Sequence, residues 1–146
     1  MKRNAIFTLL IIALSILVIA GCGSAPAPAT PAPTTQQPQG LVLDGAANYT
    51  VVKGDTLAGI AASRYGGSNM YFFPLIRLAN ASAVPDPDVI EVGTTLVIPN
   101  LQRNLDNPAA NGLIRADMLA IAGQYEKQSK PNAAKTLRNL ATRISK

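Results

Sequence analysis

The sequence contains no histidine, no tryptophan and a single cysteine. Without histidine, the usual zinc sites and the catalytic pairs of a nucleophile with histidine cannot form. A lone cysteine cannot make a disulfide within the chain, so the packing of a core has to stabilise the fold. The length of 146 residues allows one domain of ordinary size, or a very small one with extensions. We therefore expect no metal site, no cofactor and no histidine-dependent catalysis.

Charge is unevenly distributed along the chain, whose formal net charge is +5. Residues 49–99 carry three basic and four acidic side chains, whereas residues 100–146 carry eight basic and three acidic ones. The basic character therefore belongs to the C-terminal segment. It can indicate an anionic partner, although a solvated helix face is the commoner explanation.

The first 21 residues have the pattern of a signal peptide. Lys2 and Arg3 precede an apolar run over residues 5–20 that only Thr8 and Ser15 interrupt. This run is shorter than the roughly 20 residues that a transmembrane helix needs, and its length is typical of a signal-peptide hydrophobic region.

The run ends in Ile19-Ala20-Gly21-Cys22, which resembles the lipobox of bacterial lipoproteins. The resemblance implies a lipidated, palmitate-bearing Cys22 at the mature N-terminus, and stable membrane anchoring takes more than one acyl chain. The alternative is an uncleaved anchor helix with a buried cysteine. Gly23 replaces the aspartate that sorts some lipoproteins to the inner membrane, so the periplasmic face of the outer membrane is favoured within the cell envelope.

Residues 22–48 read as a linker rich in proline, alanine and threonine, with five of the eleven prolines between residues 24 and 39. Such a composition cannot bury a core. In an extended, polyproline-like form of about 3.1 Å per residue, residues 24–39 would reach roughly 50 Å, enough to lift a module away from a membrane.

Residues 49–100 predict a small α+β module. Tyr49-Thr50-Val51-Val52 alternates like a strand, and Asp55 or Thr56 can cap a helix that a glycine pair at 66–67 ends. Pro74 fits the first turn of a second helix, and residues 95–98 predict a closing strand. This order implies a two-stranded antiparallel sheet with both helices on one face.

The module resembles the lysin motif (LysM) domain over its whole length. The matching positions fall in family order: Tyr49, Val51, Gly54, Asp55, Thr56, Leu57, Ile60, Ala61, Tyr65, Gly66, Ile76, Ala79, Asn80, Asp86, Pro87, Asp88, Ile90, Gly93, Leu96, Ile98 and Pro99. The resemblance implies a βααβ fold that binds polymers containing N-acetylglucosamine, namely peptidoglycan or chitin.

In that family the sugar lies in a groove between two loops. Carried over to this sequence, the groove is formed by Gly54, Asp55, Thr56 and Leu57 on one side and by Asp88, Val89 and Ile90 on the other. Loop backbone groups can pair with an acetamido group while Leu57 or Ile90 contacts its methyl. Structural roles compete with these: a helix cap for Asp55, which we favour, a turn for Gly54, and core packing for the two apolar residues.

Two departures from the family pattern affect this groove. Phe73 stands where many LysM domains have tryptophan, and residues 67–72 are about two residues longer than usual. Tyr71, Phe72 and Phe73 could offer a stacking surface for a sugar, but we expect two of them in the core and one exposed.

Residues 101–146 predict a basic helical hairpin joined by residues 128–130. Apolar positions recur with helical spacing in both halves: Ile114, Met118, Ile121 and Tyr125, then Ala133, Leu137, Leu140 and Ile144. The hairpin could pack on the module, self-associate or dock an envelope protein. Nucleic acid is not expected as a partner of an exported chain.

Two functions compete on this sequence. The first is a lipid-anchored protein that tethers a membrane to peptidoglycan through the LysM domain. The second is an envelope scaffold whose LysM domain binds weakly and whose hairpin recruits a partner protein. We expect no catalytic residues and no enzyme activity, because a glycosidase needs two carboxylates facing each other across a cleft. Asp86 and Asp88 instead share one turn.

Overall fold

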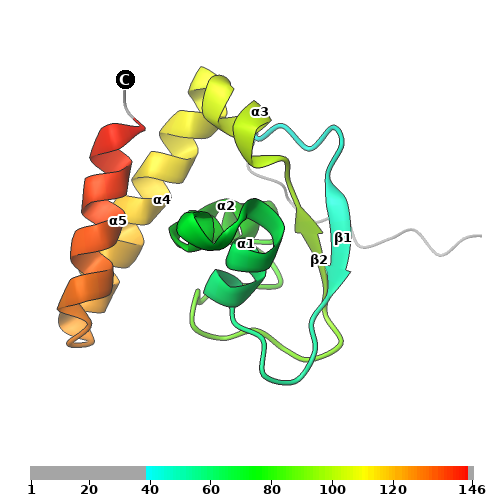
Figure 1. Cartoon of the computed structure of the whole chain (residues 1–146), viewed down its shortest axis with the longest axis horizontal. Coiled ribbons are helices and arrows are strands. Elements are labelled where there is room, and N and C mark those ends of the chain that lie inside the picture. The colour runs from blue at the N-terminus through cyan, green and yellow to red at the C-terminus, as the bar shows by residue number, and fades with distance from the viewer. Residues whose placement is uncertain (1–38, 145–146) are drawn as a thin grey trace, which may run out of the picture. The chain divides into compact units, whose positions relative to one another are not determined.

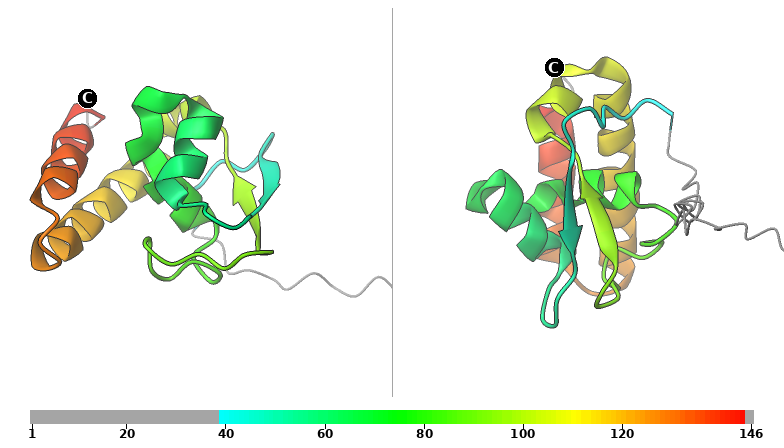
Figure 2. Two further views of the ribbon diagram at one scale, coloured as in Figure 1. Left: turned by 60° about the horizontal axis from the view of Figure 1, so that its bottom comes forward. Right: turned by 90° about the vertical axis from the view of Figure 1, so that its right-hand side faces the viewer.

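The computed structural model describes residues 39–144 and confirms the predicted fold class. The LysM-like part contains strand β1 (Ala47–Thr50), helix α1 (Leu57–Tyr65), the 3₁₀ helix η1 (Gly67–Phe72), helix α2 (Phe73–Ala79) and strand β2 (Thr95–Ile98). Three more helices follow, namely α3 (Leu101–Asp106), α4 (Pro108–Lys127) and α5 (Pro131–Arg143). Both α1 and α2 lie on one face of the two-stranded sheet, and α4 and α5 form the hairpin (Figure 1; Figure 2).

The signal peptide, the lipidation site Cys22 and residues 22–38 of the linker lie outside the described residues. Between residues 39 and 144, no helix is both long and apolar enough to cross a membrane. The final part of the predicted linker is described, and it packs against the fold. There Val42 bonds to the side chain of Asn104, and Asp44 forms an ion pair with Arg103.

Strand β1 pairs antiparallel with β2, with Ala47 opposite Ile98 and Thr50 opposite Thr95. The prediction of a strand over residues 49–52 was wrong by two residues at each end. Val52 leaves the ladder because its backbone N–H donates to the Asp55 carboxylate. Ala47 and Asn48 join it because β2 offers them partners, although their side chains have little strand preference.

Helix α1 begins after Thr56, whose hydroxyl accepts from the backbone N–H of Gly59, as an N-cap residue does. The cap that we favoured for Asp55 was therefore wrong. Gly66 ends the helix with φ of +93°, a conformation that glycine adopts without strain. Residues 67–72, expected as a longer loop, instead form η1. Phe72 and Phe73 are buried and Tyr71 is partly buried.

Helix α2 lies in the middle of one continuous core. Its apolar side chains contact α1 and β2, and α4 packs against it from outside the LysM-like part. The four residues that were predicted to be apolar on α4 are all buried in this same cluster: Ile114, Met118, Ile121 and Tyr125. Of the four predicted for the second half of the hairpin only Leu137 is buried, because the face of α5 that meets the core also carries the small residues Ala134 and Ala141; the other three are partly buried, namely Ala133, Leu140 and Ile144. The hairpin is thus packed against the module rather than separate from it.

Two buried asparagine side chains form hydrogen bonds with backbone N–H and C=O groups that have no partner on a neighbouring strand. The Asn80 side chain accepts from the Val97 N–H at 2.8 Å and donates to the Val97 carbonyl at 2.7 Å, so it occupies the free edge of β2. Asn104 makes the same pair of bonds with Val42. Each amide also donates to a carbonyl in the preceding turn. Among the described residues, no buried side-chain polar atom lacks a hydrogen-bond partner.

The Arg77–Asp117 ion pair joins α2 to α4. The guanidinium donates through Nε and Nη2 to the two carboxylate oxygens of Asp117, whose side chain is only 7% exposed. A planar guanidinium fits a carboxylate in this two-point manner, whereas a lysine ammonium does not. A third bond, from Nη1 to the Pro85 carbonyl, links the pair to the loop before β2.

We predict that Asn80→Ala destabilises the fold strongly. The change leaves the partly buried Val97 N–H and C=O without these partners, which should lower the free energy of unfolding by about 2 to 4 kcal/mol. Urea denaturation of residues 22–146 measures this loss. The exposed Asn139→Ala is the matched control and should leave stability near wild type. Equal stability of Asn80→Ala and wild type would contradict the prediction.

A second prediction concerns the pair Arg77–Asp117. Removing either partner by Arg77→Ala or Asp117→Ala should lower the free energy of unfolding by about 3 kcal/mol, because an unpaired charge remains that is buried at Asp117 or partly buried at Arg77. The double variant should be little worse than either single one, which a double-mutant cycle in urea would show as strong coupling. The exposed pair Arg138–Glu126 should show little coupling in the same experiment. Simple additivity at Arg77 and Asp117 would refute the interpretation.

Candidate functional site

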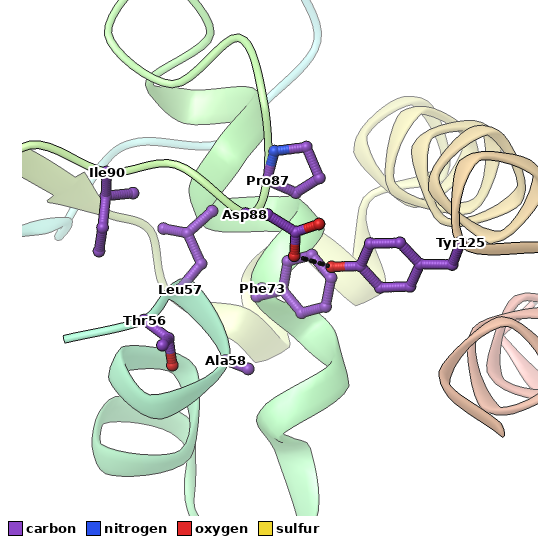
Figure 3. A pocket seen from close by; sticks show the side chains of 8 residues that line it. All are labelled: Thr56, Leu57, Ala58, Phe73, Pro87, Asp88, Ile90 and Tyr125. Atoms are coloured by element: carbon purple, nitrogen blue, oxygen red, sulfur yellow. Dashed lines mark hydrogen bonds between the residues drawn. The ribbon is translucent and has the colours of Figure 1, made fainter. Parts of the chain in front are cut away.

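A small pocket opens between the loop that precedes α1 and the loop that precedes β2 (Figure 3). It is lined by Thr56, Leu57, Ala58, Phe73, Pro87, Asp88, Ile90 and Tyr125. Its volume is about 80 Å³, far below the several hundred Å³ of a pocket for a whole drug-sized ligand. The pocket therefore fits one small substituent, and the rest of a larger ligand has to lie across its mouth.

The structure brings four of the seven predicted site residues to this pocket, namely Thr56, Leu57, Asp88 and Ile90. The other three, Gly54, Asp55 and Val89, are not among its lining residues. Gly54 adopts φ of +96° with open space where a side chain would be, so it serves the turn and leaves its backbone accessible. Val89 is 60% exposed on the neighbouring loop. Direct sugar contact by these seven residues stays a prediction.

Asp55 holds the first loop together. Its carboxylate accepts from the Tyr49 hydroxyl at 2.7 Å and from the Val52 N–H at 2.9 Å. Both hydrogen bonds hold the pKa of Asp55 below its usual value, and the bond from Val52 has the larger effect. The hydrogen bond between Tyr49 and Asp55 also raises the pKa of the Tyr49 hydroxyl. The Arg64 guanidinium lies 4.8 Å from the centre of the Tyr49 ring and covers one face of it. The Asp55 carboxylate is therefore ionised at neutral pH, and its hydrogen bonds hold the first loop in place.

The second loop has few hydrogen bonds of its own around Asp88 and Val89. The Asp86 carboxylate accepts from the Asp88 N–H at 2.8 Å, and the Asp86 carbonyl accepts from the Val89 N–H at 3.2 Å. Ile90 is partly buried against the core. Within this loop the short turn at Asp86 thus fixes the backbone only around residues 86–89.

Four of the lining residues were not among the predicted site residues, namely Ala58, Phe73, Pro87 and Tyr125, and Tyr125 is the most informative. It comes from α4, outside the LysM-like segment, and its hydroxyl donates to Asp88 at 2.9 Å (Figure 3). Burial is the main cause that raises the pKa of this hydroxyl, followed by the bond to Asp88. In the sequence Tyr125 is one more apolar position on a helix. No local pattern could therefore connect it to a loop 37 residues away.

The pocket offers apolar surface and a hydroxyl group to a ligand. Leu57, Phe73 and Ile90 supply apolar surface, and the Thr56 hydroxyl accepts from Gly59 and keeps its own proton to donate. Among residues 39–144 no cluster of acidic, histidine or cysteine side chains could hold a metal ion. The Asp55 and Asp88 carboxylates are both engaged in hydrogen bonds with neighbouring side chains.

Comparison with known proteins identifies one family. The LysM domain model matches residues 49–99. Two Mycobacterium tuberculosis proteins, Esterase MT1326 and Esterase Rv1288, are each 38% identical over 65 residues, which is 44% of this chain and 13% of theirs. The secreted LysM effector ECP6 of Passalora fulva is 39% identical over 59 residues, 40% of this chain and 23% of its own length. No solved structure matches this chain.

This chain spans less than a quarter of the length of these relatives. The similarity therefore concerns the LysM segment and leaves the hairpin unmatched by the family model. LysM domains bind glycans that contain N-acetylglucosamine. The βααβ fold, the pocket between its two loops and the family match agree, and we conclude that residues 49–99 of this chain are a LysM domain.

Proposed function

We propose that the protein binds the N-acetylglucosamine units of peptidoglycan through the pocket between the two loops. The observation that carries the proposal is the pocket itself, which lies between the two loops that the family resemblance implies and has room for about one acetamido group. Its methyl would contact Leu57 and Ile90, and the Thr56 hydroxyl would face the polar part of the sugar. The pyranose ring would then lie across the exposed loops.

We also propose that the chain tethers a membrane to the cell wall. Lipid on Cys22 would hold one end at the membrane of the cell envelope, on the periplasmic face of the outer membrane, and the proline-rich segment would supply the reach. The chain would act by binding and not as an enzyme. The esterase names of two relatives describe proteins of which this chain covers only the LysM part.

The scaffold function has one supporting observation. The hairpin exposes Leu119, which is 38% accessible, and the C-terminal segment that contains it is rich in basic residues. Against it, the apolar positions of the hairpin pack on α2 and on each other, so of the three arrangements that the sequence left open the structure shows packing on the module. We therefore place glycan binding first and partner recruitment by the hairpin second.

A glycan-binding experiment tests the first proposal. Residues 22–146 should bind N-acetylglucosamine tetramer in calorimetry and sediment with purified peptidoglycan at physiological salt. Ile90→Ala removes an apolar wall and should weaken binding by about tenfold, equivalent to about 1.4 kcal/mol. Ala58→Leu should weaken it as well, by filling the pocket. Val92→Ala changes an exposed valine outside the pocket and serves as the control.

Failure of the unaltered chain to bind either ligand would overturn the glycan proposal. Equal weakening by Val92→Ala and Ile90→Ala would show that the pocket is not the site.

A fractionation experiment tests the tether. Cys22→Ser removes the only thiol that can carry lipid, so the protein should move from the membrane fraction to the soluble fraction of the producing cells. Its affinity for N-acetylglucosamine tetramer should not change. Retention of Cys22→Ser in the membrane fraction would instead support an uncleaved apolar anchor.

A further inference from the structure

The Asp88 carboxylate is held by the helical hairpin from outside the LysM domain. One oxygen accepts from the Tyr125 hydroxyl at 2.9 Å, and the other accepts from the Lys130 ammonium at 2.7 Å. The ammonium also lies 4.7 Å from the centre of the Tyr125 ring, so the two hairpin side chains support each other. We call Asp88, Tyr125 and Lys130 the Asp88 clasp.

The structure of the hairpin fixes the positions of Tyr125 and Lys130. Tyr125 is only 7% exposed and belongs to the core cluster, so its ring has one fixed position. Lys130 lies at the junction between α4 and α5, where its N–H donates to the Tyr125 carbonyl and turns the chain back. This turn requires Ser129 at φ of +58°, a conformation that residues with a side chain seldom adopt.

The clasp acts on the part of the loop around Asp88 and Val89, which has few other hydrogen bonds. Within the loop, the backbone N–H groups of Asp88 and Val89 each donate one hydrogen bond to Asp86. The Val89 side chain is 60% exposed, so core packing does not hold this segment. Asp88 is also the point at which this loop reaches the pocket beside Tyr125 (Figure 3). Anchoring it to a rigid helix fixes that wall of the pocket before any ligand arrives, and a preorganised site binds more tightly.

We propose that Tyr125 and Lys130 are positioning residues of the glycan site and that Asp88 is the anchor through which they act. This inference rests on the proposed function. Both Asp88 oxygens are engaged by the hairpin, so the carboxylate serves the loop rather than the sugar. The glycan site therefore extends beyond the residues that the family model matches, and its affinity depends on the hairpin.

The test compares variants of residues 22–146 by calorimetric titration with N-acetylglucosamine tetramer. Tyr125→Phe keeps the ring and removes the hydroxyl, and it should weaken binding by about fivefold. Lys130→Ala changes an exposed side chain and should weaken binding by about two- to threefold with an unchanged melting temperature. Arg138→Ala breaks a hairpin ion pair that includes no lining residue and should bind like wild type.

A double variant separates positioning from a general loss of structure. If the Tyr125 hydroxyl acts through Asp88, adding Tyr125→Phe to Asp88→Ala should cause no further loss of affinity. Amide hydrogen exchange at residues 88–90 of the free protein should also be faster in Tyr125→Phe than in wild type, whereas exchange in α2 should not change.

Three results would overturn the inference. Wild-type affinity in Tyr125→Phe and Lys130→Ala, while the unaltered chain binds, would reject the clasp and leave the proposed function intact. If the losses of affinity from Tyr125→Phe and Asp88→Ala add up in the double variant, the two residues act independently, and Asp88 then contributes to sugar binding without Tyr125. Failure of the unaltered chain to bind the tetramer would reject both this inference and the proposed function.

Discussion

The burial of helix α2 is the constraint on which the rest of the structure depends. Two strands of four residues cannot form a stable sheet by themselves, so they need a helix to pack against. Five of the seven residues of α2 are buried, and they face α1, the sheet and α4. Because no single neighbour can cover a helix that is apolar on so many sides, the hairpin completes the core of the LysM domain and is not an independent appendage.

Polar contacts then fix how the hairpin lies on that core. Apolar packing sets the distance between α2 and α4 but has little directionality, whereas the two-point pair between Arg77 and Asp117 allows one orientation. The Asp88 clasp adds a second attachment nearer the end of α4. Two separate contacts along one helix define its direction as well as its position, and this places Tyr125 beside the loop that forms the pocket.

This arrangement has a consequence for the proposed tether. A glycan that binds across the pocket would contact loops held on one side by Asp55 and on the other by the hairpin. Both loops would be ordered in advance, so little conformational entropy would be lost on binding. A small pocket of about 80 Å³ could then contribute usefully to recognition of a repeated sugar, and repetition along a polymer raises the effective concentration of sites.

Local patterns in the sequence determined the βααβ order, the end of α1 at Gly66, the place of Pro74 in the first turn of α2, and the helical hairpin with its apolar positions on α4. These follow from spacing and turn chemistry, which act over a few residues. The four predicted residues that line the pocket were instead carried over from the family resemblance. The tertiary structure alone decided that Thr56 rather than Asp55 caps α1, that Asn80 covers the edge of β2, and that Tyr125 reaches Asp88. The last two contacts join residues 17 and 37 positions apart, and an asparagine or a tyrosine on a helix carries no local signal of the distant group that it will meet. Asp55 and Thr56 are both good caps, and only the competing bonds from Tyr49 and Val52 settle which one takes that role.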